Sequence, residues 1–285
     1  MKITDIFLSQ EKTFSFEFFP PKDEISAVDF GINVGRLMKL SPSFVTVTYG
    51  AGGSNQERTF ALVEYLQNEI CLTTVAHYTC INSTKERVRN DLNYLKDRGI
   101  QNLMLLRGDP PKGQEKYIPL ADGFRYASDL IEFVDENFDF CKAGAAYVDK
   151  HPEAISLKED ILNLKTKVTA GADFLITQLF FKNKHYFDFV KMARIAGINC
   201  RIIPGIIPIT SFKQIERFTK MSGADIPEEF VEKISKFKDN HEKSYETGLE
   251  FTINQCRELL RNGAPGIHFY TLNKSRAAVE IFESL

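Results

Sequence analysis

The chain has 285 residues, with 36 basic and 38 acidic side chains and a formal net charge of −2 at pH 7. This balance lacks the clustered basic excess of a nucleic-acid-binding protein, and no apolar run approaches the roughly 20 residues that a membrane-spanning helix needs. The five cysteines are widely spaced and include no C-x-x-C pair, so we expect neither a zinc knuckle nor a disulfide framework, and we expect a cytoplasmic protein.

Short runs rich in aromatic and β-branched residues recur along the chain and predict strands. In chain order, the predicted strands span 14–19, 44–49, 73–79, 102–107, 143–148, 174–180, 201–207 and 266–272. Amphipathic stretches with polar starts and glycine stops lie between them and predict helices. One follows Ser83-Thr84 and stops at Gly99, and another begins at Ser156 and ends near Ala170-Gly171.

This alternation of strands and helices is typical of βαβ units and a parallel sheet. Eight such units predict a closed (β/α)8 TIM barrel, an α/β fold that occupies residues 1–285 as a single domain. The long segment 209–265 between the seventh and eighth strands is expected to hold extra helices near 226–238 and 242–262. A doubly wound open sheet is the alternative, but no G-x-G-x-x-G follows the first strand.

The first predicted strand, FSFEFF, contains a single acidic residue, Glu17. Phenylalanine packs well on a pleated, half-buried surface, whereas glutamate is depleted there. A carboxyl group in such a run either meets a buried partner in the core or lies at a strand end beside a cleft. In the second case, loss of solvation raises its pKa toward the range that suits a general acid. The segment alone leaves both interpretations open.

In a barrel of this type the active site is formed by the C-terminal ends of the strands. Nearly every predicted strand carries a polar or aromatic residue at that end. These residues are Glu17, Thr48 and Tyr49 before the glycine-rich segment 50–54, His77 and Thr79, Arg107 and Asp109, Tyr147 and His151, Gln178, and Tyr270 and Asn273. A single polar residue at a strand end more often has a structural role, but the whole set at one end of the barrel predicts an active site. No set of histidine, aspartate and glutamate residues has the spacing of metal ligands, so we expect no metal.

Seven motifs in this order resemble one known family. They are FEFFPP (16–21), VTYGAGGS (47–54), LRGDPP (106–111), HPEA (151–154), ITQLFF (176–181), PGIIPITSF (204–212) and HFYTLN (268–273). The set is similar to methylenetetrahydrofolate reductase of the bacterial, catalytic-domain type, in register over about residues 14–276. The resemblance implies a (β/α)8 barrel that binds FAD at its C-terminal face.

The resemblance also implies an activity within one-carbon metabolism and methionine biosynthesis. The expected reaction is reduction of 5,10-methylenetetrahydrofolate to 5-methyltetrahydrofolate, with NADH or NADPH as the electron donor. Donor and folate would use one pocket in turn, in a ping-pong cycle, and the protein would be a homo-oligomer, dimer or tetramer. Two other classes stay open: a non-redox barrel transferase or lyase acting on a phosphorylated substrate, and a non-catalytic flavoprotein.

Individual residues take their roles from the matching motif positions. Glu17 would be the general acid, and Asp109 would contact the folate pterin and tune the flavin. The expected FAD contacts are Thr48, Tyr49, His77, Arg107, Gly108, Asp109, Tyr126, Ala127, Tyr147, His151, Asp160, Asn163 and Lys167. The expected folate or nicotinamide contacts are Glu17, Asp109, Gln178, Phe212, Tyr270, Leu272 and Lys274.

Two positions depart from the family pattern. Lys274 stands where bacterial relatives carry arginine after HFYTLN, and lysine cannot reproduce the bidentate geometry of a guanidinium group. Thr166 stands where a basic residue is common, between Lys165 and Lys167. Without the resemblance, these two lysines would be interpreted as a solvated helix face. Neither departure affects Glu17, Asp109 or Gln178, so we expect activity to be retained.

Overall fold

The computed structural model of the protein describes residues 1–49, 56–109, 117–222 and 225–285. Its strands are β1 (Thr13–Phe18), β2 (Phe44–Val47), β3 (Thr74–Thr79), β4 (Asn102–Leu106), β5 (Cys141–Ala146), β6 (Phe174–Thr177), β7 (Arg201–Ile203), β8 (Gly205–Ile206) and β9 (Gly266–Tyr270). All of them pair in parallel, in the order β7-β6-β5-β4-β3-β2-β1-β9-β8.

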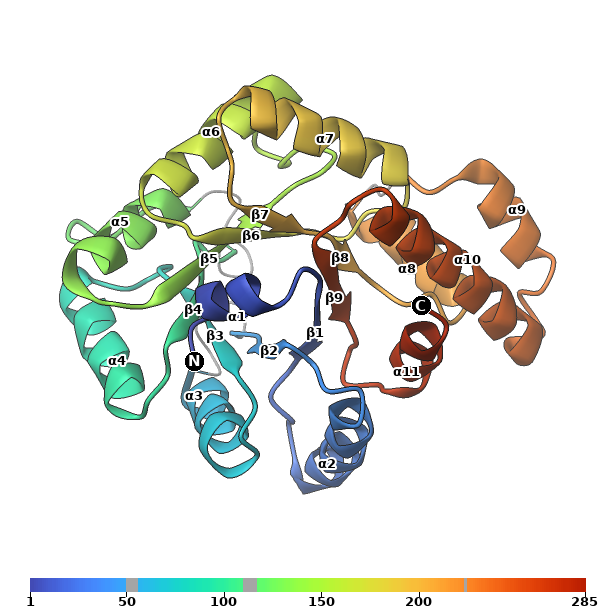
Figure 1. The fold of residues 1–285 in the computed structure, drawn as a ribbon, viewed down its shortest axis with the longest axis horizontal. Coiled ribbons are helices and arrows are strands. Elements are labelled where there is room, and N and C mark those ends of the chain that lie inside the picture. Colours follow the sequence, from blue (N-terminus) through green and yellow to red (C-terminus); the bar gives the residue numbers. More distant parts are fainter. Residues whose placement is uncertain (50–55, 110–116, 223–224) are drawn as a thin grey trace.

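The sheet closes into a barrel through the segment that contains β7 and β8. Only Pro204 separates these two strands. The strand is interrupted there because proline has no backbone N–H to donate to a neighbouring strand. β7 pairs with β6 and β8 pairs with β9, and the Pro204 carbonyl accepts a hydrogen bond from the His268 N–H at 2.9 Å. One continuous segment therefore joins both ends of the sheet, as Figure 1 shows.

Helices surround the ring of strands, except α1, which lies across one end of it (Figure 1). They are α1 (Ile3–Ser9), α2 (Glu24–Met38), α3 (Gln56–Glu64) with the π-helical turn η2 (Tyr65–Glu69), α4 (Lys85–Asp97), α5 (Ala127–Asn137), α6 (Leu157–Thr169), α7 (Asn183–Ile195), α8 (Phe212–Ser222), α9 (Glu228–Ser235), α10 (His241–Arg261) and α11 (Arg276–Glu283). The predicted barrel and the extra helices between its last strands are confirmed. Helices α1 and α8 were not predicted.

The helix boundary signals of the sequence act as predicted. The Thr84 side chain accepts a hydrogen bond from the Arg87 N–H at the start of α4, and Ser156 accepts one from the Glu159 N–H at the start of α6. Both bonds satisfy backbone donors that a helix cannot satisfy itself. Within the described part of the chain, no helix is long and apolar enough to cross a membrane.

Successive side chains of each strand alternate between the barrel interior and the helical layer. In β1, the Phe18 ring packs outward against Phe30 of α2, with 5.4 Å between ring centroids. Ser15 lies on the other face and contacts His268 inside the barrel. The alternation places Glu17 on the same interior face as Ser15.

Helix α1 closes the N-terminal end of the barrel and lies at the centre of the ring in Figure 1. Ile3 and Ile6 pack into the interior cluster that contains Phe44 and Phe174. The Ile3 N–H donates to Asn102 Oδ1 at 2.8 Å, and Asn102 Nδ2 donates to the Met1 carbonyl at 3.0 Å. The interior is therefore sealed at this end, and polar groups in it face the opposite, C-terminal end.

Candidate active site

Glu17 lies inside the barrel near the C-terminal end of β1, with 7% of the residue exposed. Its Oε2 lies 3.7 Å from His77 Nε2 of β3. That distance allows an ion pair, but burial disfavours the charged form of each group. Burial raises the pKa of Glu17 to about 8 and lowers the pKa of His77 to about 4. At neutral pH the pair is a protonated acid beside a neutral imidazole.

Two residues of β9 extend this polar group along the barrel interior. Tyr270, which pairs with Glu17 across β1 and β9, donates its hydroxyl to the Thr177 carbonyl at 2.7 Å. Below it, His268 Nδ1 lies 2.8 Å from Ser15 Oγ. Burial, and secondarily the repulsion that a protonated His77 would exert, lowers the pKa of His268 to about 3. Both histidines are therefore neutral, and they add no fixed charge beside the acid.

A second group of candidates surrounds Arg107, which directly follows β4. Its guanidinium group donates to both carboxylate oxygens of Glu153, at 2.7 and 2.6 Å, and this bidentate pair lowers the pKa of Glu153. The rings of Tyr147 and His151 meet edge to face, with centroids 4.7 Å apart. The backbone N–H of His151 donates to Asp160 at 2.8 Å, which ties the loop after β5 to helix α6.

Helix α6 carries three of the predicted cofactor contacts on one face. Asp160, Asn163 and Lys167 are spaced by three and four residues, the spacing of neighbours on a helix surface. Lys167 Nζ donates to the Ala145 carbonyl at 3.0 Å, and burial lowers its pKa. Lys165 is exposed. The interpretation as a solvated helix face therefore holds for Lys165 and is wrong for Lys167.

Other candidates reach the same face from neighbouring strand ends. Gln178, which follows β6, is exposed, and its backbone N–H donates to the Ala146 carbonyl at 2.7 Å. Burial raises the pKa of Tyr147, and a side-chain hydrogen bond to Gln178 opposes this shift. Thr48 continues the ladder after β2 by donating its N–H to Phe18 at 2.9 Å. These contacts connect the ends of β1, β2, β5 and β6.

Gly108 and Asp109 follow Arg107 at the same end of the barrel. Gly108 has φ +92°, and a Cβ there would lie 2.8 Å from Ile81 Cγ2, so the turn requires glycine. The turn leaves Asp109 exposed. Tyr49, after β2, is half-buried with its ring 5.5 Å from that of Tyr78. The glycine-rich segment 50–54 and residues 110–111 of the motifs lie outside the described residues.

Five predicted contacts come from the starts of two helices and from the segment after β9. Phe212 begins α8 and donates its N–H to Ser244 Oγ at 2.9 Å. Ala127 begins α5 after the exposed Tyr126, and Leu272 and Lys274 are exposed beyond β9. Across the described ranges, no hydrogen bond joins the side chains of these residues to the Glu17 or Arg107 groups. The structure brings together the other candidates, which come from the strand ends and α6.

Thr46 is a buried polar residue of this site that the sequence analysis missed. It is fully buried on β2 directly opposite Glu17. Thr46 Oγ1, His77 Nε2 and Thr79 Oγ1 are buried atoms without a hydrogen-bond partner among the residues described. The sequence FVTVTY contains the signal, because strand alternation places Thr46 on the same face as Thr48.

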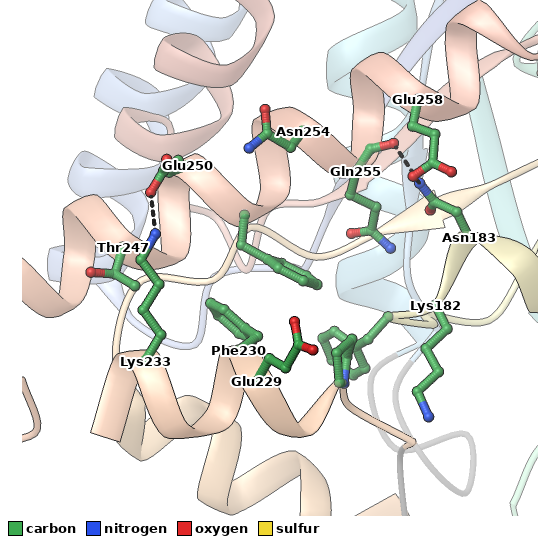
Figure 2. Close-up of a pocket in the computed structure, with 13 residues that line it drawn as sticks. Lys182, Asn183, Glu229, Phe230, Lys233, Thr247, Glu250, Asn254, Gln255 and Glu258 are labelled. Carbon is green, nitrogen blue, oxygen red and sulfur yellow. Dashed lines mark hydrogen bonds and ion pairs between the residues drawn. The ribbon is translucent and has the colours of Figure 1, made fainter. Parts of the chain in front are cut away.

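A separate cavity of about 430 Å³ lies outside the ring of strands, between the start of α7 and helices α9 and α10 (Figure 2). Its polar lining is largely paired. Lys233 contacts Glu250 at 2.7 Å, and Asn183 Nδ2 donates to Glu258 at 2.8 Å. None of the predicted site residues lines it. We therefore keep the candidate site at the barrel end. A second cavity, of about 340 Å³, lies beside α10 and is also lined by none of the predicted site residues.

Residues 1–49, 56–109, 117–222 and 225–285 contain no cluster of three or more histidine, cysteine or acidic side chains that could hold a metal. The arrangement is that of a (β/α)8 barrel with a buried, protonated acid at the C-terminal ends of its strands. The chain belongs to the methylenetetrahydrofolate reductase family, whose model matches residues 2–285. The resemblance inferred from the motifs is confirmed.

Similar proteins agree with this assignment. The 5,10-methylenetetrahydrofolate reductase of Escherichia coli is 36% identical over 271 residues, which cover 95% of this chain and 90% of that protein. Methylenetetrahydrofolate reductase (NADH) 1 of Arabidopsis thaliana is 36% identical over 295 residues. The chain spans about half the length of that plant relative, 50%.

Solved structures share the fold at low sequence identity. A protein from Clostridium thermocellum, described as binding two copies of 5-methyl-5,6,7,8-tetrahydrofolic acid, superposes with a TM-score of 0.66 at 17% identity, over 98% of this chain and 96% of that one. An oxaloacetate acetylhydrolase superposes with a TM-score of 0.51 at 10% identity, over 93% of this chain and 96% of that one. At these identities the likeness extends to the fold alone.

Proposed function

We propose that this protein reduces 5,10-methylenetetrahydrofolate to 5-methyltetrahydrofolate with electrons from NADH or NADPH, and that it requires FAD. The observation that carries the proposal is Glu17, a buried carboxyl group that is protonated at neutral pH, in a chain of this family. A neutral acid at the end of a barrel can deliver a proton to a bound substrate. The reaction consumes one proton in addition to the hydride, so it needs such a group.

The donor groups at the barrel end suit FAD. Arg107 and Lys167 are two cations whose mutual repulsion is felt at Lys167, and each can donate hydrogen bonds to the oxygens of a pyrophosphate. The unpartnered Thr79 hydroxyl and the Tyr147 side chain add polar groups for the remainder of the cofactor. We assign the expected contacts at Thr48, Tyr49, His77, Gly108, Tyr126, Ala127, His151, Asp160 and Asn163 to the same group. FAD, when bound, supplies hydride transfer.

Glu17 would act on the folate. The five-membered ring that joins N5 and N10 must open before the one-carbon unit can accept a hydride, and protonation of N10 makes that nitrogen a better leaving group. Glu17 supplies this proton, because burial holds it in the protonated state at neutral pH. The general acid step is worth about 10²–10⁴-fold in rate.

Asp109 and the outer residues would orient the substrates. Asp109 is exposed at its turn, where its carboxylate would contact the pterin and disfavour extra negative charge on a reduced cofactor. Phe212 and Tyr270 pack against one apolar cluster, and Phe212 would stack on a flat aromatic part of either substrate. Gln178, Leu272 and Lys274 complete the proposed substrate contacts.

The first experiment tests the cofactor and the two substrates separately. Purified protein should be yellow, or become yellow with added FAD, and should bleach anaerobically with NADH or NADPH. Addition of 5,10-methylenetetrahydrofolate should then restore the colour in stopped-flow absorbance. Parallel runs with the two nicotinamides would identify the preferred donor. A colourless protein that takes up no FAD, or bleached protein that folate does not reoxidise, would contradict the proposal.

The folate step should depend on pH through Glu17. Burial raises the pKa of Glu17 to about 8, so the carboxyl group is protonated below that pH and deprotonated above it. We expect the reoxidation rate to be nearly constant from about pH 6 to about pH 7.5 and then to fall about tenfold per pH unit above about pH 8. Stopped-flow reoxidation over this range measures the profile. A rate that rises with pH would rule out an acid role.

A further inference from the structure

The hydroxyl of Thr46 is a buried donor beside the proposed acid, and it has no hydrogen-bond partner in the described part of the chain. Thr46 is 0% exposed, and its Oγ1 makes no hydrogen bond to any described residue. A buried hydroxyl without a partner costs free energy, so such a group calls for an explanation. Here β2 pairs with β1 so that Thr46 lies directly opposite Glu17. Side chains of paired residues on one face of a sheet are close enough to interact.

Strand alternation places both side chains on the inner face of the barrel. Phe44 packs in the interior cluster below, whereas Val45 and Val47 pack in the cluster that includes the outer helices. Thr46 therefore points inward with Phe44. Glu17 also points inward, since its Oε2 lies 3.7 Å from His77 Nε2. The two side chains are thus cross-strand neighbours inside the barrel.

A protonated carboxyl group needs one hydrogen-bond donor and one acceptor. The threonine hydroxyl can donate to its carbonyl oxygen. The unpartnered His77 Nε2 can accept from its O–H, in the tautomer that carries the ring hydrogen on Nδ1, after a small rotation that shortens the 3.7 Å separation. Two buried groups without partners therefore complement the two oxygens of a neutral acid. Only the acceptor, His77 Nε2, fits a carboxylate less well, whereas the Thr46 hydroxyl can donate to either state of Glu17.

We propose that Thr46 is a positioning residue, which together with His77 holds the protonated carboxyl of Glu17 aimed at the substrate. The inference rests on the proposed function, since the orientation of the Glu17 carboxyl group matters only if Glu17 donates a proton to folate. In the step, the Glu17 O–H bond breaks and an N10–H bond forms. The resulting carboxylate accepts the Thr46 hydrogen bond and later regains a proton from solvent water.

Among the residues that the structure describes, the groups that face Glu17 carry no charge at neutral pH. They are His77 from β3, Tyr270 from β9 and, below them, His268 from β9. Burial lowers the pKa of His77 to about 4 and that of His268 to about 3, and burial raises the pKa of Tyr270. Replacement of Thr46 by an uncharged residue therefore changes one hydrogen bond and leaves the local charge as it was.

The test is Thr46→Val, which keeps the shape and removes the hydroxyl. Loss of a donor to the carboxylate should raise the pKa of Glu17, measured in cofactor-free protein by infrared titration of the carboxyl band, with Glu17→Gln to assign the band. Folate-dependent reoxidation should slow about tenfold, as expected for one lost hydrogen bond. Reduction by NADH should change less than about twofold, and Thr46→Ser should restore both values.

Thr13→Val is the matched control, because it removes a buried hydroxyl at the far end of β1 and should alter neither the titration nor the rates. If Thr46→Val does not fold, Thr46→Ala removes the same hydroxyl. An unchanged Glu17 titration with an unchanged reoxidation rate overturns the inference. If the parent protein itself fails to react with folate, the proposed function is wrong, while the infrared titration still decides whether Thr46 acts on Glu17.

Discussion

Replacement of Glu17 by glutamine should separate the two halves of the reaction. We expect Glu17→Gln to slow reoxidation by 5,10-methylenetetrahydrofolate by about 10²–10⁴-fold, the usual worth of a general acid. Reduction by NADH should proceed within a few-fold of the parent rate, because hydride delivery to a flavin requires no proton from the protein. Stopped-flow absorbance measures each half-reaction on its own. Equal losses in both would show that Glu17 orients substrates and does not act as an acid.

The Glu17→Gln variant should fold normally, so slower reoxidation could not be attributed to misfolding. At neutral pH the parent side chain is a neutral acid, since burial raises its pKa to about 8, and glutamine is a neutral group of the same shape. The folded protein binds this proton more tightly than the unfolded chain, so its stability falls as the pH rises from about 4.5 to about 8. Glu17→Gln should lack that part of the pH dependence.

A conservative change elsewhere controls for the substitution itself. Glu232 is exposed on α9, outside the ring of strands in Figure 1. Glu232→Gln should leave both half-reactions and the pH dependence of stability at parent values. The contrast isolates burial as the property that makes Glu17 an acid.

The barrel could be predicted because its signal is repeated. Eight apolar runs separated by amphipathic stretches leave few alternatives for a chain of this length. The predicted boundaries differ from the observed ones at the C-terminal ends of two strands. The predicted strand 174–180 ends at Thr177, and the predicted strand 201–207 divides at Pro204. In both places the apolar run continues past the last backbone hydrogen bond of the strand. Residues such as Phe180 are buried although the strand has ended, so apolar sequence alone does not mark the strand end.

Helix α1 shows what the local pattern could not reveal. The segment Ile3–Ser9 is a helix of only two turns, too short to be stable by itself. Its stability comes from contacts distant in sequence, such as the Ile3 bond to Asn102 and the packing of Ile6 inside the barrel. No periodicity within seven residues encodes such contacts.

For the candidate site, the sequence could indicate which residues lie at the strand ends, but not their partners or protonation states. Glu17, His77 and Arg107 were each identified by their position at a strand end. That Glu17 meets a neutral histidine, and that Arg107 already forms a bidentate pair with Glu153, depends on the closure of the barrel. Thr46 was missed because threonine in a strand usually requires no special explanation. The unpaired state of the Thr46 hydroxyl among the described residues, and its position opposite Glu17, can be recognised only once β1 and β2 are paired.

Gly266, the first residue of β9, should tolerate no side chain. It has φ +138°, and a Cβ there would overlap the Thr13 carbonyl oxygen and lie 2.6 Å from the Thr13 nitrogen. These backbone atoms belong to the neighbouring strand β1 and cannot rotate away as a flexible side chain could. We expect Gly266→Ala to destabilise the fold by more than about 4 kcal/mol, which lowers the melting temperature by about 10 °C or more or prevents folding.

Two other glycines separate the steric cause from the conformational one. Gly263 has φ +87°, but apart from its two chain neighbours no described residue has an atom within 4 Å of the position that a Cβ would take there. Gly263→Ala should therefore cost about 1–2 kcal/mol, the left-handed strain alone. Gly248 has no positive φ, yet its Cβ would lie 2.5 Å from the Ile209 carbonyl, so Gly248→Ala tests contact alone. Calorimetric melting of the three variants should rank Gly263→Ala as the mildest. If Gly266→Ala melts no lower than Gly263→Ala, the close approach of β1 and β9 is wrong.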